Sequence, residues 1–444
     1  MKSNIGRSES GAILKSFGAG VVPRIGLQHV AVGRQKEVSA FLDDFATIED
    51  GGAAFRIVCG PYGSGKSFLL QMIRNNAMER GFVVVDADLS PERRLTGSKG
   101  QGLATYRELI KNMAIRIRRD KGALESVLQR WVNGLQNTVA KEYDLKPGDP
   151  KLIDEVSKKI SEVTMRLSEM VYGFSFGSVI ESYWRGIKTG DDSLKQASLR
   201  WLRGEFATKT EAKRYLPVDR IIDDENWYEF LKLLALFVCE AGYNGLLVFL
   251  DEGVSLYKIP NKQSREKNYE KLLAIFNDTM QGKVQHLGVF LSGTPQFIYD
   301  ERRGLFSYEA LRSRLSDGRF GNSDFANYTG PVIKLDKLSP EEVYLLLERL
   351  NHIHSIHYSY PQVLGQAELT AFLDTVASRL GADKLLTPRE ISRDFLELLD
   401  ILYQNPQVRF YDLIEAPDFH IESAKEDPEQ ITKDSDELFA DFEI

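Results

Sequence analysis

The chain has 444 residues, of which 43% are hydrophobic and 27% charged, with 35 glycines and 15 prolines. This composition is typical of a soluble globular protein of two or three domains, and it excludes a collagen-like or wholly disordered chain. The net charge of −7 taken alone argues against a nucleic-acid partner. Because no apolar run approaches the roughly 20 residues of a membrane span and the first residues lack a signal-peptide core, we expect a cytoplasmic protein with no membrane contact.

The negative charge is concentrated at the end of the chain. Residues 422–444 contain nine acidic and two basic side chains, a balance of −7, so the preceding residues are formally neutral. We expect this acidic tail to be disordered and self-repelling. An alternative is that the tail docks through Leu438, Phe439 and Phe442. The two cysteines, Cys59 and Cys239, lie in apolar runs and are expected to be buried, reduced thiols.

Short apolar runs alternate with longer segments that have helical spacing. The runs predict five strands, at 55–59, 82–87, 246–250, 287–292 and 332–335. The longer segments predict helices, among them 67–78, 106–118, 226–240 and 269–280. Strands that alternate with helices indicate an α/β fold with a parallel five-stranded sheet covered on both faces.

Two regions depart from this alternation. Residues from about 120 to 225 contain helical patterns and no apolar strand-like run, which indicates a helical insertion. After 336 the pattern is wholly helical, beginning with a capping box at Ser339 and Glu342. We therefore predict an α/β core at 1–336, a small helical domain at 337–404 and a C-terminal extension at 405–444.

The strongest motif is a complete GxxxxGK[ST] loop between a predicted strand and a predicted helix. Such a loop holds a phosphate chain with backbone N–H groups, so glycines are needed for close approach, and the helix that follows presents its positive end. Its lysine neutralises the β- and γ-phosphates of ATP and its serine hydroxyl binds Mg²⁺. The expected nucleotide-binding residues are Gly60, Pro61, Tyr62, Gly63, Ser64, Gly65, Lys66 and Ser67.

A second apolar strand, 246–250, ends in Asp251 and Glu252. We expect Asp251 to bind Mg²⁺, directly or through water, and Glu252 to act as the general base that polarises the attacking water. The alternative acids are Asp86 and Asp88, at the end of the strand 82–87.

The next strand along the chain ends in short polar residues. Ser292, Gly293 and Thr294 follow the run LGVFL, and a hydroxyl there could contact the γ-phosphate or the attacking water. We favour Thr294 over Ser292 for this role. An ordinary turn at these residues is the alternative.

In these features the chain resembles the AAA+ ATPases of the origin-recognition type. The resemblance implies that the C-terminal helical domain is a lid, and that Val32, Gly33 and Arg34, in the segment VGRQKE, lie beside the adenine. It also implies that Arg314, within 311–315, is an arginine finger that reaches the γ-phosphate of a neighbouring subunit, and that Arg389 of the lid is a second sensor. A homo-oligomer follows from the finger; surface arginines on helices are the alternative.

A closer resemblance is to the BrxC/BrxD ATP-binding proteins of BREX-type phage-defence systems. It rests on the stretches at 87–95, 199–205, 250–252, 292–295 and 387–391, and it covers the chain from about 20 to 400. The length is closer to that of BrxD than to that of the much longer BrxC. The resemblance implies an ATPase in a defence locus, commonly encoded beside a large DNA helicase, which is the expected partner.

Basic residues of the insertion suggest a DNA surface, because cations follow phosphates while aromatic rings stack on bases. The residues are Arg185, Lys188, Lys195, Arg200, Arg203, Lys209, Lys213 and Arg214, interleaved with Trp184, Trp201 and Tyr215. A buried role for the tryptophans and a solvated helix face are the alternative. A second basic segment, 107–121, is predicted to be an ordinary solvated helix. His352, His354 and His357 are interpreted as helix-end histidines rather than metal ligands.

The motifs predict a Mg²⁺-dependent ATP hydrolase with possible DNA contact, and the resemblances imply that it is of the AAA+ class and acts in phage defence with a helicase partner. Two rival functions stay open. One is a nucleotide-controlled helicase loader or switch with little turnover, and the other is a scaffold in which the nucleotide is structural.

Overall fold

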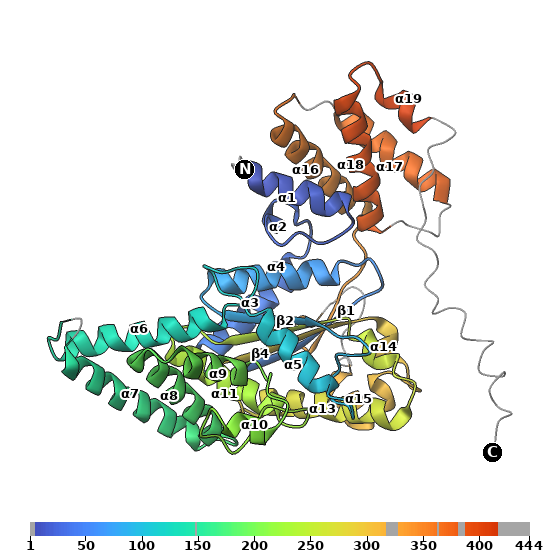
Figure 1. Cartoon of the computed structure of the whole chain (residues 1–444). Coiled ribbons are helices and arrows are strands. Elements are labelled where there is room, and N and C mark those ends of the chain that lie inside the picture. The colour runs from blue at the N-terminus through green and yellow to red at the C-terminus, as the bar shows by residue number, and fades with distance from the viewer. Residues whose placement is uncertain (1–4, 147–148, 317–326, 362–363, 381–386, 416–444) are drawn as a thin grey trace. The chain divides into compact units, whose positions relative to one another are not determined.

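Figure 1 shows the computed structural model of the chain. It describes residues 5–146, 149–316, 327–361, 364–380 and 387–415, so the predicted acidic tail lies outside the described residues. The chain divides into two compact units. The sheet unit comprises Gln35–Pro61 and Lys66–Leu335, and the helical unit comprises residues up to Arg34, Tyr62–Gly65 and residues from Asp336 onward.

The sheet unit is built on five parallel strands, which confirms the predicted fold class of an α/β P-loop NTPase core. The strands are β1 (Ala53–Cys59), β2 (Val83–Asp88), β3 (Leu246–Asp251), β4 (Leu287–Gly293) and β5 (Val332–Lys334), in the spatial order β2-β3-β4-β1-β5. The pairings Cys59–Gly293 and Asp88–Asp251 bring the carboxyl ends of four strands to one edge. Ligands of such sheets bind at this edge.

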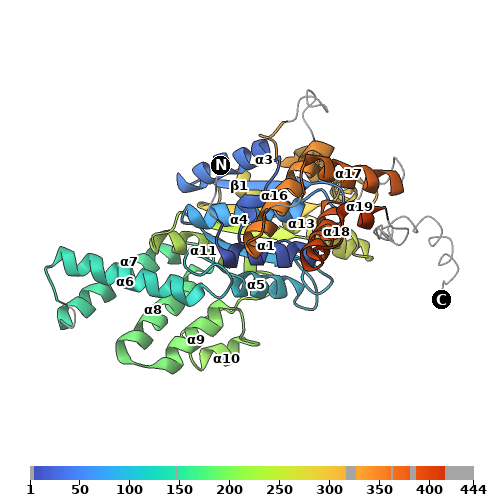
Figure 2. The same cartoon turned by 90° about the horizontal axis from the view of Figure 1, so that it is seen from above.

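Helices cover both faces of the sheet because the strand residues are apolar on both sides (Figures 1 and 2). On one face, α3 (Gln35–Glu49) and α4 (Lys66–Glu79) pack against residues such as Val84 and Phe290. On the other face, α11 (Trp227–Glu240) and α13 (Lys262–Met280) pack against residues such as Val85 and Val289. The site-bearing strand ends are thus held by a core on each side.

Helices fill the region between β2 and β3, as the sequence predicts for the insertion. They are α5 (Gln101–Lys111), α6 (Leu124–Glu142), α7 (Pro150–Ser168), α8 (Gly173–Thr189), α9 (Asp192–Leu202) and α10 (Lys209–Lys213). Trp131 and Trp201 are almost fully buried among them. The insertion therefore has a core of its own that continues into the face covered by α11 and α13.

The prediction of one helix from 106 to 118 is wrong at its C-terminal end. The helix α5 ends at Lys111, and Ala114 then exchanges backbone hydrogen bonds with Val84 of the edge strand β2, at 2.9 and 3.0 Å. Ile115 and Arg118 pair with each other in the same way, so Arg116 and Ile117 form the tip of a two-residue turn. Backbone N–H and C=O groups that are hydrogen-bonded within a helix cannot also pair with a strand. The pairing of Ala114 with β2 therefore takes the place of the last predicted turns of the helix.

Four short helical elements follow in the sheet unit: α12 (Val254–Tyr257), α14 (Pro295–Tyr299), the 3₁₀ turn η1 (Leu305–Ser307) and α15 (Glu309–Leu315). The helical unit contains α1 (Arg7–Gly18), α2 (Leu27–Val30), α16 (Pro340–Tyr358), α17 (Gln366–Leu380), α18 (Pro388–Gln404) and α19 (Phe410–Ile414). Within it α1 packs against α16 and α18. The capping box predicted at Ser339 and Glu342 begins α16, with both reciprocal hydrogen bonds present.

Candidate nucleotide site

The GxxxxGK[ST] loop connects β1 to α4, as its sequence context predicts. Gly60 N–H donates to Gly293 O at 3.1 Å, which fixes the start of the loop against the end of β4. Gly65 has a φ of 88° with open space around the position of a Cβ, so backbone strain rather than crowding requires glycine there. The loop ends at Lys66 and Ser67, the first two residues of α4, where unpaired N–H groups favour an anion.

Lys66 lies among the strand ends. Its Nζ donates to the carbonyl oxygens of Gly60 and Pro61 at 2.8 and 2.9 Å. Burial lowers the pKa of Lys66, while the carboxylates of Asp251 and Glu252 act in the opposite direction. The lysine and the two acids predicted from separate motifs are therefore near enough to interact electrostatically.

Three carboxyl groups gather where β2 and β3 end. Asp88 lies opposite Asp251 in the strand register, and Glu252 follows directly. Burial and the charge of Asp251 raise the pKa of both Asp88 and Glu252, and Lys66 partly offsets this for Glu252. Asp86, the other acid weighed from the sequence, instead pairs with Arg74 Nε of α4 at 2.7 Å. A local excess of carboxylates is a setting that a divalent cation with phosphates can balance.

Glu252 has a φ of 58°, in the left-handed region that residues other than glycine seldom adopt. The next residue accounts for this backbone conformation of Glu252. Gly253 N–H donates to Ser292 O at 2.9 Å, and a Cβ at position 253 would lie only 2.4 Å from that oxygen. Strained backbone at a strand end is typical of sites where a side chain must be aimed. Gly253 was not among the site residues predicted from the sequence, although the residues DEG directly after an apolar strand were a visible signal.

The two hydroxyl residues at the end of β4 make different contacts. Ser292 Oγ, which is buried, donates to Asp251 Oδ1, and Glu252 N–H donates to the same oxygen at 2.9 Å. Thr294 Oγ1 accepts from Phe297 N–H at 3.3 Å and caps α14. The structure thus brings Ser292 to the acid cluster and uses Thr294, the residue favoured from the sequence, in a helix cap.

Replacing Ser292 by alanine is expected to weaken Mg²⁺-dependent ATP binding about tenfold, because a carboxylate that loses its orienting hydrogen bond holds a metal less well. A titration of ATP binding against Mg²⁺ concentration measures this. The matched control is Thr294→Ala, which removes a hydroxyl from the same strand end. A larger effect of Thr294→Ala than of Ser292→Ala would contradict the orienting role of Ser292.

The tip of the loop, Tyr62–Gly65, is grouped with the helical unit, where two predicted site arginines contact it. Arg34 Nη2 donates to Ser64 O at 3.1 Å, and Arg389 Nη1 donates to Tyr62 Oη at 3.1 Å. Ser64 Oγ is buried without a hydrogen-bond partner. A buried hydroxyl in a phosphate loop is a donor that a nucleotide oxygen could use.

The segment around Arg34 has a special backbone. Gly33 and Arg34 have φ values of 63° and 66°, and Val32 is buried. Arg34 Nη2 also donates to Asp336 O at 2.5 Å. These contacts hold Arg34 against the loop.

Arg314 is exposed on α15. Its Nε donates to Asn277 Oδ1 of α13 at 3.0 Å and its Nη1 to Ala310 O at 2.7 Å. Arg312 of the same helix pairs with Glu301 at 2.8 Å. The guanidinium of Arg314 is therefore directed along the surface of α13.

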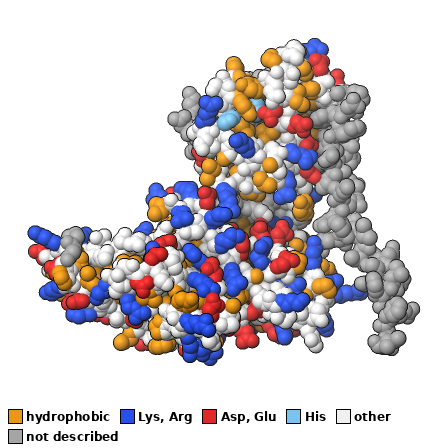
Figure 3. Space-filling model, viewed as in Figure 1, with side chains coloured by type: hydrophobic (Ala, Val, Ile, Leu, Met, Phe, Trp, Pro, Cys, Tyr) orange, Lys and Arg blue, Asp and Glu red, His pale blue; other side chains and the backbone are white. Residues whose placement is uncertain are grey.

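The DNA interpretation of Trp184 and Trp201 is wrong, because both side chains are buried in the insertion. Trp184 Nε1 donates to Ser157 Oγ at 3.0 Å and Trp201 Nε1 to Arg220 O at 3.0 Å, so neither ring is available for stacking. Several of the predicted cations are paired with carboxylates: Lys188 with Asp154, Lys195 with Glu125 and Arg200 with Glu211. Figure 3 shows basic and acidic side chains interspersed on the face that it presents.

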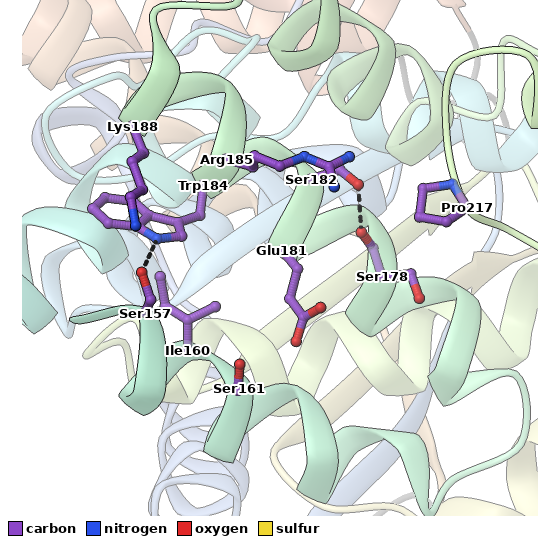
Figure 4. A pocket seen from close by; sticks show the side chains of 10 residues that line it. All are labelled: Ser157, Ile160, Ser161, Ser178, Glu181, Ser182, Trp184, Arg185, Lys188 and Pro217. Carbon is purple, nitrogen blue, oxygen red and sulfur yellow. Dashed lines mark hydrogen bonds between the residues drawn. The ribbon is translucent and has the colours of Figure 1, made fainter. Parts of the chain in front are cut away.

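A pocket of about 270 Å³ lies between α7 and α8 of the insertion (Figure 4). Several of its polar groups already have partners in the protein. Glu181 accepts from Thr164 at 2.7 Å, Lys188 pairs with Asp154, and Ser157 accepts from Trp184. These groups are therefore committed to contacts within the insertion.

The three histidines lie in the last turns of α16, as predicted. His354 is buried, with Nδ1 2.6 Å from Tyr360 Oη and Nε2 3.0 Å from Asp400 Oδ1. Burial lowers the pKa of His354 and Asp400 raises it. Within the described ranges no group of three His, Cys, Asp or Glu residues is placed to hold a metal ion.

The parallel sheet, the glycine loop that leads into α4 and the acids beside Lys66 define a P-loop nucleotide-binding protein. The family model described as BREX system ATP-binding protein BrxC/D matches residues 5–418. The chain therefore belongs to this family of ATP-binding proteins of the BREX phage-defence system, which confirms the resemblance noted from the sequence. No curated protein gives a significant match. Among the helices that the structure describes, none has the length and apolar character of a membrane span.

Proposed function

We propose that the chain is a Mg²⁺-dependent ATP hydrolase of the AAA+ class that acts in BREX defence. The observation that carries the proposal is the geometry of the strand ends: the glycine loop leads from β1 into α4 with Lys66 across it, and Asp251 and Glu252 stand at the end of β3 in the same parallel sheet. Lys66 binds the β- and γ-phosphates, and Glu252 accepts a proton from the attacking water. The raised pKa of Glu252 suits a general base, because it makes the carboxylate a better proton acceptor.

Asp251 and Ser67 are the proposed Mg²⁺ ligands. Magnesium in nucleotide sites is usually bound by one or two carboxylate or hydroxyl groups together with phosphate oxygens and water, so this small set of donors fits it. Bound Mg²⁺ would neutralise charge on the phosphates. Ser292 orients Asp251 through its hydrogen bond, and Asp88 adds negative charge beside the site.

Contacts to the rest of the nucleotide are assigned to the residues that the AAA+ resemblance indicates. The backbone N–H groups of residues 60–67 surround the phosphates, and Val32, Gly33 and Arg34 lie beside the base. Arg389 is proposed as the lid sensor of the γ-phosphate. Its hydrogen bond to Tyr62 supports this role, because Tyr62 belongs to the phosphate loop.

Arg314 is proposed to act on the ATP of a neighbouring subunit, which makes hydrolysis depend on a homo-oligomer. We expect Arg314→Ala to retain ATP and to lose hydrolysis by about 10³-fold or more. Mixing Arg314→Ala with Glu252→Gln subunits tests the arrangement in trans. Mixed oligomers place an intact Glu252 opposite an intact Arg314, so hydrolysis should partly return; no return would place Arg314 in its own subunit's site or outside catalysis.

The cellular role is proposed to involve DNA and a helicase or other BREX protein, in the cytoplasm. Steady-state ATP hydrolysis without nucleic acid, with single-stranded DNA and with duplex DNA tests this, and stimulation that fades with salt supports it. Stoichiometric retention of ATP with helicase capture would instead favour a loader or switch. Normal phage restriction by a Lys66→Ala strain would favour a scaffold with a structural nucleotide.

A further inference from the structure

The turn at Arg116 and Ile117 is the most exposed apolar point among the described residues. The Ile117 side chain is 86% exposed, more than any other large hydrophobic residue there. It is flanked by Arg116, Arg118 and Arg119, all exposed. A single exposed apolar residue needs no explanation by itself. An exposed isoleucine among exposed arginines is different, because proteins that bind the minor groove of DNA combine basic side chains with an inserted apolar side chain.

The turn is held rigidly. Backbone hydrogen bonds of 2.9 and 3.0 Å between Ile115 and Arg118 close it, and Ala123 N–H donates to Met113 O at 2.9 Å at its base. Met113, Ala114 and Ile115 are buried. Arg116 and Ile117 are not among the residues with positive φ, so side-chain replacements at the tip carry no backbone strain.

The turn is also tied to the helix of the phosphate loop. Glu79, at the C-terminal end of α4, pairs with Arg116 at 3.1 Å and with Arg119. Arg74 of α4, itself buried, binds Asp86 of β2 and donates to Arg119 O at 3.3 and 3.4 Å. The helix that begins at Lys66 and Ser67 thus ends against the arginines of the turn.

We infer that this turn is a contact site for duplex DNA, in which Arg116 and Arg119 bind backbone phosphates and Ile117 inserts at a base step. Guanidinium groups match phosphate geometry, and apolar wedges flanked by arginine insert between base pairs in the minor groove. The pairs with Glu79 are exposed and correspondingly weak, so phosphates can replace the carboxylate. A lipid surface fits less well, because one side chain supplies little apolar area for membrane insertion.

The inference rests on the DNA association proposed above. It assigns a DNA contact to a turn within the basic segment 107–121, which the sequence predicted to be an ordinary solvated helix. It also gives DNA a physical route to the ATP site, since Arg116, Arg119 and Arg74 contact α4 or are part of it. Release of Glu79 by phosphates would change the contacts at one end of the helix whose other end bears Lys66. DNA bound at the turn is therefore expected to stimulate hydrolysis.

The test compares the full-length protein with Ile117→Ser and with Arg116→Ala/Arg119→Ala, by fluorescence anisotropy on a 20-base-pair duplex over a salt series. For the double arginine variant the slope of log K against log salt should fall by about 2, since two phosphate contacts are lost. For Ile117→Ser we expect about tenfold weaker binding. A 2-aminopurine probe in the duplex should brighten with the wild type and stay dark with Ile117→Ser, because only the isoleucine unstacks bases.

Met165→Ser on α7 is the matched apolar control, since that side chain is 70% exposed and lies in the insertion. Lys209→Ala/Lys213→Ala tests the rival surface at α10. Equal DNA binding by wild type and both turn variants, or loss of binding only in the α10 variant, would refute the turn while leaving DNA association intact. Absence of DNA binding by the wild type would refute both the turn as a DNA site and the proposed DNA association. Binding of the turn to phosphatidylserine vesicles, without binding to DNA, would have the same meaning.

Basal hydrolysis separates this inference from the ATPase proposal. Ile117→Ser should keep the basal rate and lose the DNA stimulation. Stimulation that survives in both turn variants would contradict the proposed route through α4.

Discussion

Glutamine in place of Glu252 should lower ATP hydrolysis roughly 100- to 10,000-fold while ATP still binds, because the amide cannot accept the proton of the attacking water. The substitution keeps the size of the side chain and removes only its charge. It also relieves the repulsion that Asp251 and Glu252 exert on each other. Binding of ATP is therefore expected to be unchanged or tighter, with the nucleotide retained on the protein.

Single-turnover hydrolysis and equilibrium binding measure the two effects separately. Glu270→Gln, an exposed residue of α13, is the matched control and should behave as the wild type. As a second readout, the wild-type rate should decline on the acid side at a pH above the usual range of a glutamate, since burial and Asp251 raise the pKa of Glu252. Undiminished hydrolysis by Glu252→Gln would remove the residue from its proposed role.

Replacing Lys66 by alanine should weaken ATP binding by about 100-fold or more, since the ammonium group supplies charge-assisted hydrogen bonds to two phosphates. The variant also loses the hydrogen bonds to Gly60 O and Pro61 O that hold the lysine across the loop. The loss should therefore extend to ADP, although less strongly, because ADP lacks the γ-phosphate.

Thermal unfolding with and without ATP reports the change, because a ligand that binds the folded state raises the midpoint in proportion to the logarithm of its concentration over Kd. Lys271→Ala is a matched control. Lys271 of α13 is another lysine whose pKa is lowered by burial, and its Nζ donates to Glu225 O at 3.1 Å. An ATP-dependent midpoint shift in Lys66→Ala equal to that of the wild type would contradict the assignment.

Residues whose role depends on local pattern were predictable from the sequence. The five strands are short β-branched and aromatic runs, and they lie close to their predicted positions. Lys66, Asp251 and Glu252 could be named because a phosphate loop and an acid-ended strand are readable within a few residues. Their placement at one edge of the same sheet is an observation of the structure that the sequence only implied.

Residues whose role depends on distant pairing were not predictable. The choice between Ser292 and Thr294 at Asp251 depends on the register of β4 beside β3. The helical spacing around Trp201 is the same whether its ring faces solvent or the core. The structure shows that the ring is buried in the core. The tail of the predicted helix 106–118 became a turn because Ala114 pairs with Val84 of β2, a contact that no local pattern reveals.

The placement of the insertion has a consequence for the synthesis of the protein. Asp88 and Asp251 are neighbours in the sheet, but β2 and β3 are separated in the chain by the whole helical insertion. On the ribosome, β2 leaves the exit tunnel long before β3 exists to pair with it, and contacts between such distant segments form slowly. The pairing of Val84 with Ala114 covers the outer edge of β2, the one that faces away from β3. Because Ala114 leaves the tunnel soon after β2, we expect this outer edge to be covered while the edge that will receive β3 is still open.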